Sequence, residues 1–430
     1  MCNSTASAAT GKASCFEYRW IDGAENVEKY RPGGYHPVVV GDELTDRYKV
    51  VHKLGHGAFS TIWLARDKDR ASYVAIKVST ANAPPREAEI LHALVNFSDT
   101  KGGPGREMVP VVQDRFELQG PNGCHRCYVT SPAQSSVAAA KFCDLFTVET
   151  ARVLVAQLVS AVAYIHFRGV VHGDIHLGNA LLRLPAMFDA LSVEQVYERF
   201  NGPQTQDIVR VDGKPLLPNA PTHATLAVWL GKTAHDISPS EARLVLSDFG
   251  EAFSPATKKR RGDEYHAPLT VVPPEVLFRP ETPISFAVDI WALACAIWSI
   301  FGTRPIFDGT LATWDDIAAQ QVDIFGYSSV PREWWDGWEE RHRYFDKAGQ
   351  PNAGRSVFPS LESSFEEDVQ AMRRGDGMAD FGSEETIAIF AMLRGMLVFR
   401  PEERATAEDV MGCKWMKSWG LPELEKARKT

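Results

Sequence analysis

The strongest constraint on the fold is a change of pattern near residue 133. Before it, short segments rich in β-branched and aromatic residues alternate with turn residues, which predicts strands over 48–54, 61–65 and 72–78 and two more within 107–130. After it, apolar residues recur at helical spacing, and residues 290–298 are apolar all round, as in a buried helix. Strands followed by helices predict an α+β fold of two lobes with a cleft between them.

The small lobe is expected to be an antiparallel sheet with one helix over 86–94, and the larger lobe to be helical. We expect the following divisions: an N-terminal lead-in over 1–47, a two-lobed domain over 48–417 (N-lobe 48–133, C-lobe 134–417), a Pro/Gly-punctuated insertion over 180–247 and a tail over 418–430.

Composition narrows the classes of function. The 430 residues carry a formal charge of −9, which disfavours direct nucleic-acid binding because phosphate contacts need a basic surface. The seven scattered cysteines do not form a disulfide framework, and the zinc-like pair Cys124 and Cys127 has no second pair. The N-terminus lacks the features of a signal peptide, and the apolar run 290–301 is too short to span a bilayer. We expect a monomer of the cytoplasm, the nucleus or both, with no membrane association.

Two motifs fall in the predicted small lobe. Residues 55–62 read Gly-His-Gly-Ala-Phe-Ser-Thr-Ile between two strands, and glycines allow backbone amides to approach phosphate oxygens, although any hairpin can carry two glycines. Lys77 lies in an apolar strand and needs an anionic partner, either a nucleotide phosphate or a carboxylate. Glu87 is the natural carboxylate, with Glu89 as the fallback.

Two further motifs fall in the predicted large lobe. Residues 172–179 read His-Gly-Asp-Ile-His-Leu-Gly-Asn, in which Asp174 can accept a hydroxyl proton and Asn179 can hold a metal ion. Asp248 precedes Phe249 and Gly250 and offers a carboxylate to Mg²⁺, which prefers hard oxygen ligands. The four motifs in this order indicate phosphoryl transfer.

The chain resembles a protein kinase and, among kinases, the SR-protein kinase family with its fungal relatives. The resemblance covers roughly residues 30–417 and includes the lead-in 30–42, the segment 54–65 and the landmarks Pro273-Pro274-Glu275, Asp289-Ile290-Trp291 and 400–406. It implies a protein serine/threonine kinase that uses ATP and Mg²⁺ and acts on a basic or Arg/Ser-rich protein, with splicing proteins and mRNA processing as candidates.

The resemblance also implies roles for individual residues. Lys77, Asp174, His176 and Asn179 would be catalytic, and Asn179 and Asp248 would bind the metal. Glu275 and Arg404 would form a buried ion pair, and Asp289 would brace the catalytic loop. The expected nucleotide-binding residues are Leu54, Gly55, His56, Gly57, Ala58, Phe59, Ser60, Ile62, Ala75, Lys77, Glu87 and Leu181.

Three features depart from the common kinase pattern. Gly173 replaces the Arg that normally pairs with a phosphorylated activation segment, which predicts activity without loop phosphorylation. His176 replaces the usual Lys, which predicts a lower rate at neutral pH. Only nine residues separate Lys77 from Glu87, so the regulatory helix is expected to be short.

Alternatives remain open at this point. The sequence of the 172–179 loop is also similar to that of small-molecule phosphotransferases of the aminoglycoside-kinase type. A catalytically weak pseudokinase scaffold is a third interpretation. The basic run 258–261 is expected to be solvated. The acid-rich stretch 332–385, with Trp334, Trp335 and Trp338, is expected either to dock an Arg-rich peptide or to be a solvated insertion.

Overall fold

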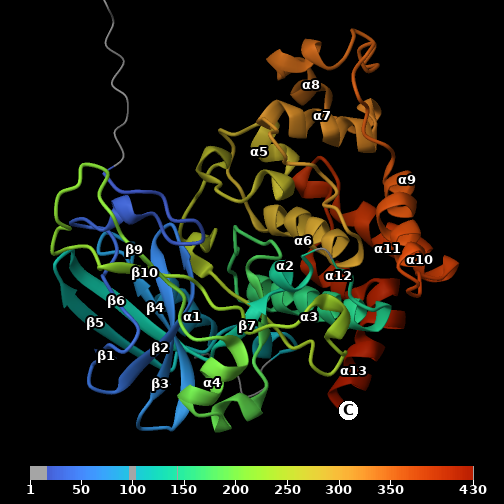
Figure 1. The fold of residues 1–430 in the computed structure, drawn as a ribbon. Helices are drawn as coiled ribbons and strands as arrows, with labels where there is room; N and C mark the ends of the chain where they lie inside the picture. The colour runs from blue at the N-terminus through green and yellow to red at the C-terminus, as the bar shows by residue number, and fades with distance from the viewer. Residues whose placement is uncertain (1–16, 96–102, 143, 430) are drawn as a thin grey trace, which may run out of the picture. The chain divides into compact units, whose positions relative to one another are not determined.

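The five strands predicted before residue 133 are β2 (Tyr48–Gly57), β3 (Ser60–Asp67), β4 (Ser72–Ser79), β5 (Asp114–Gly120) and β6 (Gly123–Thr130). They join a short strand that was not predicted, β1 (Glu43–Leu44), in one sheet of order β1-β2-β3-β4-β6-β5, in which hairpin neighbours are antiparallel (Figure 1). The structure is a computed structural model and describes residues 17–95, 103–142 and 144–429. Met1, Cys2, Cys15 and Cys143, which entered the composition argument, lie outside the described residues.

The described chain falls into two units, and unit 1 comprises 17–83, 114–129 and 189–228. Its elements are η1 (Val27–Lys29), β1 (Glu43–Leu44), β2 (Tyr48–Gly57), β3 (Ser60–Asp67), β4 (Ser72–Ser79), β5 (Asp114–Gly120), β6 (Gly123–Thr130), α4 (Val193–Phe200), β9 (Thr205–Asp207) and β10 (His223–Thr225). The sheet core contains Tyr48, Trp63 and Ile76, which are almost completely buried. The neighbouring positions Leu64 and Ala75 are buried as well, so β3 and β4 are covered on both faces over part of their length.

Unit 2 comprises the remaining described residues, and it is mostly helical. Its strands and helices are α1 (Arg86–Val95), β7 (Ala133–Ser136), α2 (Val137–Ala140), α3 (Val148–Phe167), β8 (Ala180–Arg183), β11 (Leu244–Leu246), α5 (Pro274–Phe278), α6 (Phe286–Phe301), α7 (Trp314–Phe325), α8 (Arg332–Gly337), α9 (Leu361–Phe365), α10 (Met372–Gly375), α11 (Ser383–Met396), α12 (Ala407–Gly412) and α13 (Leu421–Lys429). Short 3₁₀ and π turns connect them.

The centre of unit 2 is the pair α3 and α6, which contact each other and are buried along most of their length. Residues 290–298 of α6 are all buried and apolar, as the sequence predicts. α3 is long and apolar enough to span a membrane by length and composition alone, but most of its residues are buried inside the unit, as in the core helix of a globular protein.

The insertion and the lead-in pack differently from expectation. Residues 189–228 of the insertion belong to unit 1, although they fall within the bounds 134–417 that the sequence predicted for the C-lobe. Their apolar side chains Ile208 and Ala224 share a core cluster with Tyr18, Ile21 and Tyr35 of the lead-in. Each segment therefore supplies the apolar partner that the other lacks.

The tryptophans of the acid-rich stretch are not available as docking anchors. Trp334, Trp335 and Trp338 are buried, at 6–8% exposure, in a cluster with Phe345 and Phe399. The aromatic residues of 332–345 therefore form a local core, and they cannot serve as apolar anchors for an Arg-rich peptide.

Candidate active site

The loop between α3 and β8 fixes the carboxylate of Asp174. Asn179 Nδ2 donates to the Asp174 carbonyl oxygen and to Asp174 Oδ2, both at 2.9 Å. The other oxygen, Oδ1, is buried and accepts no hydrogen bond within the described chain. The Asp174 side chain as a whole remains 19% exposed, and a carboxylate has lone pairs beyond the one that Asn179 uses, so it can still accept a hydroxyl proton.

His176 lies beside the same oxygen. Its Nε2 is 3.6 Å from Asp174 Oδ1, and its Nδ1 accepts a hydrogen bond from the Gly178 backbone N–H at 3.1 Å. A Cβ at position 178 would come within 2.7 Å of the imidazole, so any larger residue there would displace the His176 ring. With Nδ1 acting as the acceptor, the proton of the neutral ring sits on Nε2 and points toward Asp174.

The Asp289 side chain holds this loop by accepting hydrogen bonds from the loop backbone. The Asp289 side chain comes from α6 and is fully buried, and it accepts bonds from His172 N at 2.7 Å and Gly173 N at 2.9 Å. His166 Nε2 lies 2.9 Å from Asp289 Oδ2. The predicted bracing of the loop by Asp289 is present in the structure.

Asp248 lies next to Asn179 because Ser247 joins their two segments. Ser247 donates to the Asn179 carbonyl oxygen from its backbone nitrogen at 2.8 Å and from its Oγ at 2.9 Å. Asp248 follows with an exposed side chain and a left-handed backbone, φ +63°, which aspartate tolerates better than most residues.

The residue after Asp248 anchors this turn in unit 2. Phe249 is fully buried against the His172 ring, with ring centroids 4.7 Å apart. The Phe249 backbone nitrogen donates to Glu87 Oε1 at 3.1 Å. Glu87, in the first turn of α1, therefore binds the turn that carries Asp248, a contact that the sequence did not predict.

The chemistry of these side chains suits a hard divalent cation. The amide nitrogen of Asn179 binds Asp174, so Asn179 Oδ1 is the atom that could bind a cation, and Asp248 carries its exposed carboxylate directly after Ser247, which binds the Asn179 carbonyl group. Amide and carboxylate oxygens suit Mg²⁺, which usually takes few protein ligands together with water and phosphate oxygens. The described residues contain no cluster of three or more His, Cys, Asp or Glu that would form a complete protein cage.

The remaining predicted site residues divide between the units. The turn 55–60, Ile62, Ala75 and Lys77 belong to unit 1, whereas Glu87 and Leu181 belong to unit 2. In unit 1, Ile62 pairs in register with Lys77, and the Lys77 ammonium lies 5.9 Å from the centre of the Tyr128 ring. The Lys77–Glu87 pair and the adenine-binding pair Ala75 and Leu181 therefore stay predictions.

The basic run 258–261 is only partly solvated, contrary to expectation. Arg260 is buried and donates to the Glu251 carbonyl oxygen and to Glu251 Oε2, both at 2.6 Å. The same carbonyl oxygen would lie 3.1 Å from a Cβ at Gly173, whose φ is +78°. The Arg260–Glu251 ion pair therefore lies close to Gly173, the position at which the common kinase pattern has an arginine.

The other two predicted ion-pair residues are also in place. Arg404 binds both Glu275 oxygens, at 2.9 and 2.7 Å, and both side chains are buried. This pair joins α5 to the segment before α12 and has a structural role.

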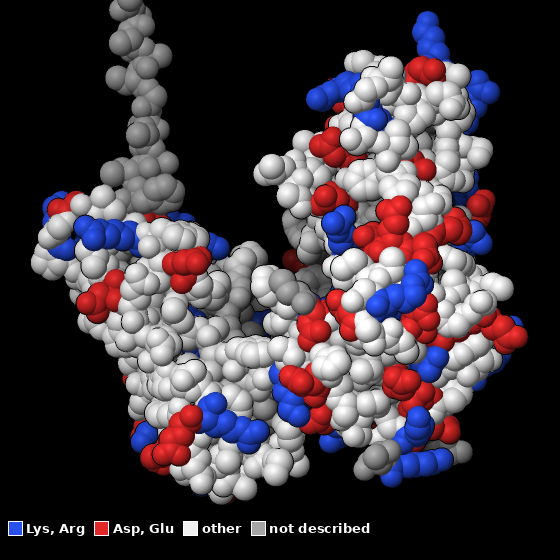
Figure 2. All heavy atoms as spheres, turned by 45° about the vertical axis from the view of Figure 1, so that its right-hand side comes forward, with Lys and Arg blue, Asp and Glu red and all other residues white. Residues whose placement is uncertain are grey.

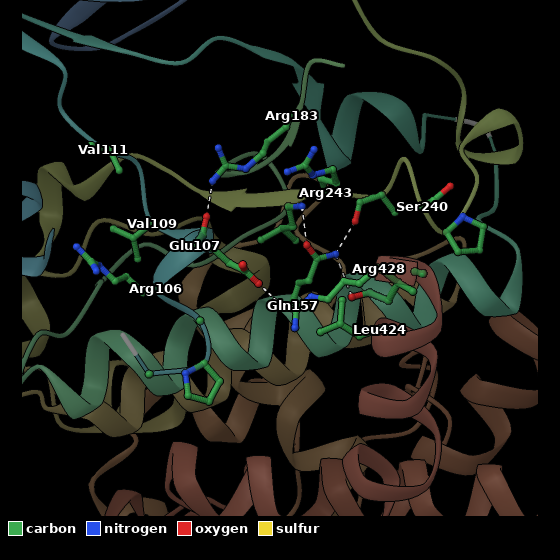
Figure 3. Close-up of a pocket in the computed structure, with 18 of the residues that line it drawn as sticks. Arg106, Glu107, Val109, Val111, Gln157, Arg183, Ser240, Arg243, Leu424 and Arg428 are labelled. Carbon is green, nitrogen blue, oxygen red and sulfur yellow. Dashed lines mark hydrogen bonds and ion pairs between the residues drawn. The ribbon is translucent and has the colours of Figure 1, made fainter. Parts of the chain in front are cut away.

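A separate cavity of about 1250 Å³ in unit 2 contains none of the predicted site residues (Figure 3). It is lined by β8, the segment before β11, the 103–111 segment and α13. Arg183 donates to the Glu107 carbonyl oxygen there, and burial together with the charge of Arg243 lowers the pKa of Arg183. Four lining residues are arginines, Arg106, Arg183, Arg243 and Arg428, and Glu107 is the one carboxylate among the lining residues.

Comparison with known proteins identifies the class of enzyme. A serine/threonine protein kinase of Aspergillus fumigatus is 25% identical over 413 residues, 92% of each chain. The serine/threonine-protein kinase SRPK of Physarum polycephalum is 26% identical over 424 residues, 91% of each chain. Human SRSF protein kinase 3 is 34% identical over 167 residues, 37% of this chain and 29% of that protein.

No family model matches the chain. The relatives are serine/threonine protein kinases, SRPK family members among them, and this chain is accordingly an enzyme of the protein kinase class.

Proposed function

We propose that the protein is a two-lobed serine/threonine kinase that transfers the γ-phosphoryl group of ATP to a protein hydroxyl. The observation that carries this proposal is the Asp174 carboxylate, whose Oδ2 is held by Asn179 and whose side chain remains 19% exposed. A serine or threonine hydroxyl that donates to this carboxylate would be oriented toward the phosphoryl group, as positioning catalysis requires.

The metal and nucleotide roles follow from the same motifs. Asn179 and Asp248 would hold Mg²⁺, which when bound neutralises charge on the phosphate oxygens. Lys77 would contact the α- and β-phosphates and Glu87 would orient Lys77, while the turn 55–60 would cover the nucleotide.

For the acceptor, we propose a basic, Arg/Ser-rich protein. Two relatives support this class by name, since they are called SRPK and SRSF protein kinases. Asp and Glu side chains gather on one face of the helix-rich unit (Figure 2). In that unit the π-helical turn η10 (Glu366–Ala371) begins with Glu366, Glu367 and Asp368. Carboxylates of this kind attract arginine through charge-assisted hydrogen bonds.

Substrate class can be tested by a matched set of acceptors. The purified protein is incubated with Mg-ATP and an Arg-Ser repeat peptide, a Lys-Ser repeat of equal length and charge, and an aminoglycoside. We expect transfer to serine that is faster on the Arg-Ser peptide. Equal rates on both peptides would remove the arginine preference, and transfer to the aminoglycoside alone would overturn the protein-kinase proposal.

A further inference from the structure

The lead-in holds the glycine turn through two of its backbone carbonyl groups. Tyr35 Oη donates to the Gly57 carbonyl oxygen at 2.7 Å, and Lys29 Nζ donates to the Ala58 carbonyl oxygen at 3.1 Å. The next carbonyl, of Phe59, accepts from Thr80 N at 2.8 Å. Three consecutive peptide groups of an exposed turn are therefore fixed from neighbouring segments of unit 1.

We propose that Lys29 and Tyr35 are positioning residues for the nucleotide. They form a clamp, defined by these two side chains, that turns the N–H groups of Ala58 and Phe59 toward the phosphate groups of ATP. This inference rests on the proposed kinase function and deepens it, because it assigns a task to a segment outside the predicted catalytic domain.

The geometry of the peptide bond connects the clamp to the phosphates. In a planar trans peptide, the C=O of one residue and the N–H of the next point in opposite directions. Fixing the Gly57 carbonyl toward Tyr35 therefore fixes the Ala58 N–H on the opposite side of the turn. The Ala58 carbonyl and Lys29 do the same for the Phe59 N–H. Backbone N–H groups that converge on one side of a turn form an anion-binding concavity.

The clamp itself is rigid because a tight turn separates its two residues. A Cβ at Gly34 would lie 1.8 Å from the Lys29 carbonyl oxygen, so this position admits only glycine. The Tyr35 N–H closes the turn by donating to that same oxygen at 3.1 Å. Lys29 and Tyr35 are thus held side by side at a fixed spacing.

Three other segments of unit 1 anchor this turn. Asn122 Nδ2, from the β5–β6 turn, donates to the Tyr35 carbonyl oxygen at 2.7 Å and to the Asn219 carbonyl oxygen at 2.8 Å. Asn219, from the insertion, donates to the Tyr30 carbonyl oxygen at 2.6 Å. Ala81 N, after β4, donates to the Gly34 carbonyl oxygen at 3.0 Å. The insertion therefore contributes to the clamp as well.

A buried ion pair ties the lead-in to strand β2. Glu25 binds both Lys53 on β2 and the Tyr30 hydroxyl, and all three side chains are buried. Burial raises the pKa of Tyr30 well above its usual range, and the adjacent Glu25 carboxylate raises it further, so the hydroxyl stays a donor. The lead-in is consequently fixed at both ends of the clamp.

The test compares two tyrosines that each donate to a carbonyl of β2. Tyr35→Phe removes the bond to Gly57, whereas Tyr197→Phe removes the bond from α4 to the Val51 carbonyl oxygen, 2.9 Å, away from the turn. Lys29→Met is the second test variant and preserves the aliphatic stem. The readouts are the Kd of a non-hydrolysable ATP analogue by calorimetry, the KM for ATP and the hydrogen exchange of the Ala58 and Phe59 amides.

We expect Tyr35→Phe and Lys29→Met each to raise the analogue Kd and the KM by about threefold to tenfold, the size of one net hydrogen bond. With the analogue bound, protection of the Ala58 and Phe59 amides from exchange should fall in both variants, and Tyr197→Phe should stay within about twofold of wild type. If the clamp variants bind the analogue as tightly as Tyr197→Phe does, the clamp is refuted while the kinase proposal stands. If the wild-type protein does not bind the analogue, the kinase proposal fails and the clamp fails with it.

Discussion

The substitution Asp289→Asn tests whether the bracing of the Asp174 loop matters for catalysis. Asp289 is fully buried and accepts two backbone N–H groups and one histidine N–H, at 2.7 to 2.9 Å. An amide in its place loses at least one charge-assisted bond, worth about 1.5–3 kcal/mol, and leaves a buried donor facing a donor, about 1–3 kcal/mol more. We therefore expect the free energy of unfolding to fall by about 3–5 kcal/mol.

The matched control is Asp323→Asn in the same unit. Asp323 is equally buried and accepts from Arg355 Nη2 at 2.6 Å, from Arg355 Nη1 at 2.8 Å and from Phe358 N at 3.1 Å, but it does not contact the Asp174 loop. Urea unfolding and kcat are measured at a temperature where both variants are folded. Comparable losses of stability are expected, with kcat reduced about tenfold or more only in Asp289→Asn, because small misplacements of a catalytic group are costly. Equal kcat values in the two variants would refute the bracing argument.

Four further predictions concern single sites. Gly173→Arg should lower the free energy of unfolding by about 1–2 kcal/mol, because φ is +78° and the Glu251 carbonyl oxygen lies 3.1 Å from the new Cβ. Because position 173 carries no arginine for a phosphorylated loop, phosphatase treatment of the wild-type protein should leave its activity unchanged. His176→Lys should raise kcat at pH 8, because lysine is charged there and a neutral histidine is not; an unchanged kcat would remove His176 from the phosphoryl-transfer step. Arg404→Leu should cost about 3–5 kcal/mol in urea unfolding by leaving Glu275 buried and unpaired, and Glu275→Leu in the same chain should recover part of that loss. Burial and the neighbouring His125 lower the pKa of His36 to about 4. The unfolded chain therefore binds more protons than the folded one between pH 6.5 and 4. The free energy of unfolding should fall as the pH drops through this window, and it should fall less in His36→Gln.

Two contacts of unit 2 were predicted from the kinase resemblance, namely the bracing by Asp289 and the Glu275–Arg404 pair. The hydrogen bond between Asn179 and Asp174 was not predicted. Strands β2 to β6 were predictable because β-branched and aromatic runs bounded by turn residues are local signals, whereas the short strands β1, β9 and β10 were not.

Contacts between distant polar segments were not predictable. Glu25 and Lys53 lie 28 residues apart, and Asn122 and Asn219 lie 97 apart, with no pattern linking them. The sequence therefore predicted only a lead-in outside the two-lobed domain, although apolar residues of this segment complete a cluster with the insertion.

Burial of single side chains in polar segments was also not predictable. Trp334, Trp335 and Trp338 lie in an acid-rich stretch, and its composition does not show whether their side chains face the core or the solvent. Arg260 was expected in solvent for the same reason, and its burial depends on Glu251 and on the Phe253 ring, 5.4 Å from its guanidinium.

The most direct test of the central claim is a single-turnover measurement of phosphoryl transfer with Asp174→Asn. Labelled Mg-ATP and an Arg-Ser peptide are mixed with wild-type protein, with Asp174→Asn and with Asp380→Asn, an exposed aspartate paired with Arg374. We predict serine phosphorylation by wild type and Asp380→Asn, and a loss of about 100-fold or more in Asp174→Asn with unchanged binding of ATP. Transfer by Asp174→Asn at the wild-type rate, or no transfer by the wild-type protein, would contradict the account.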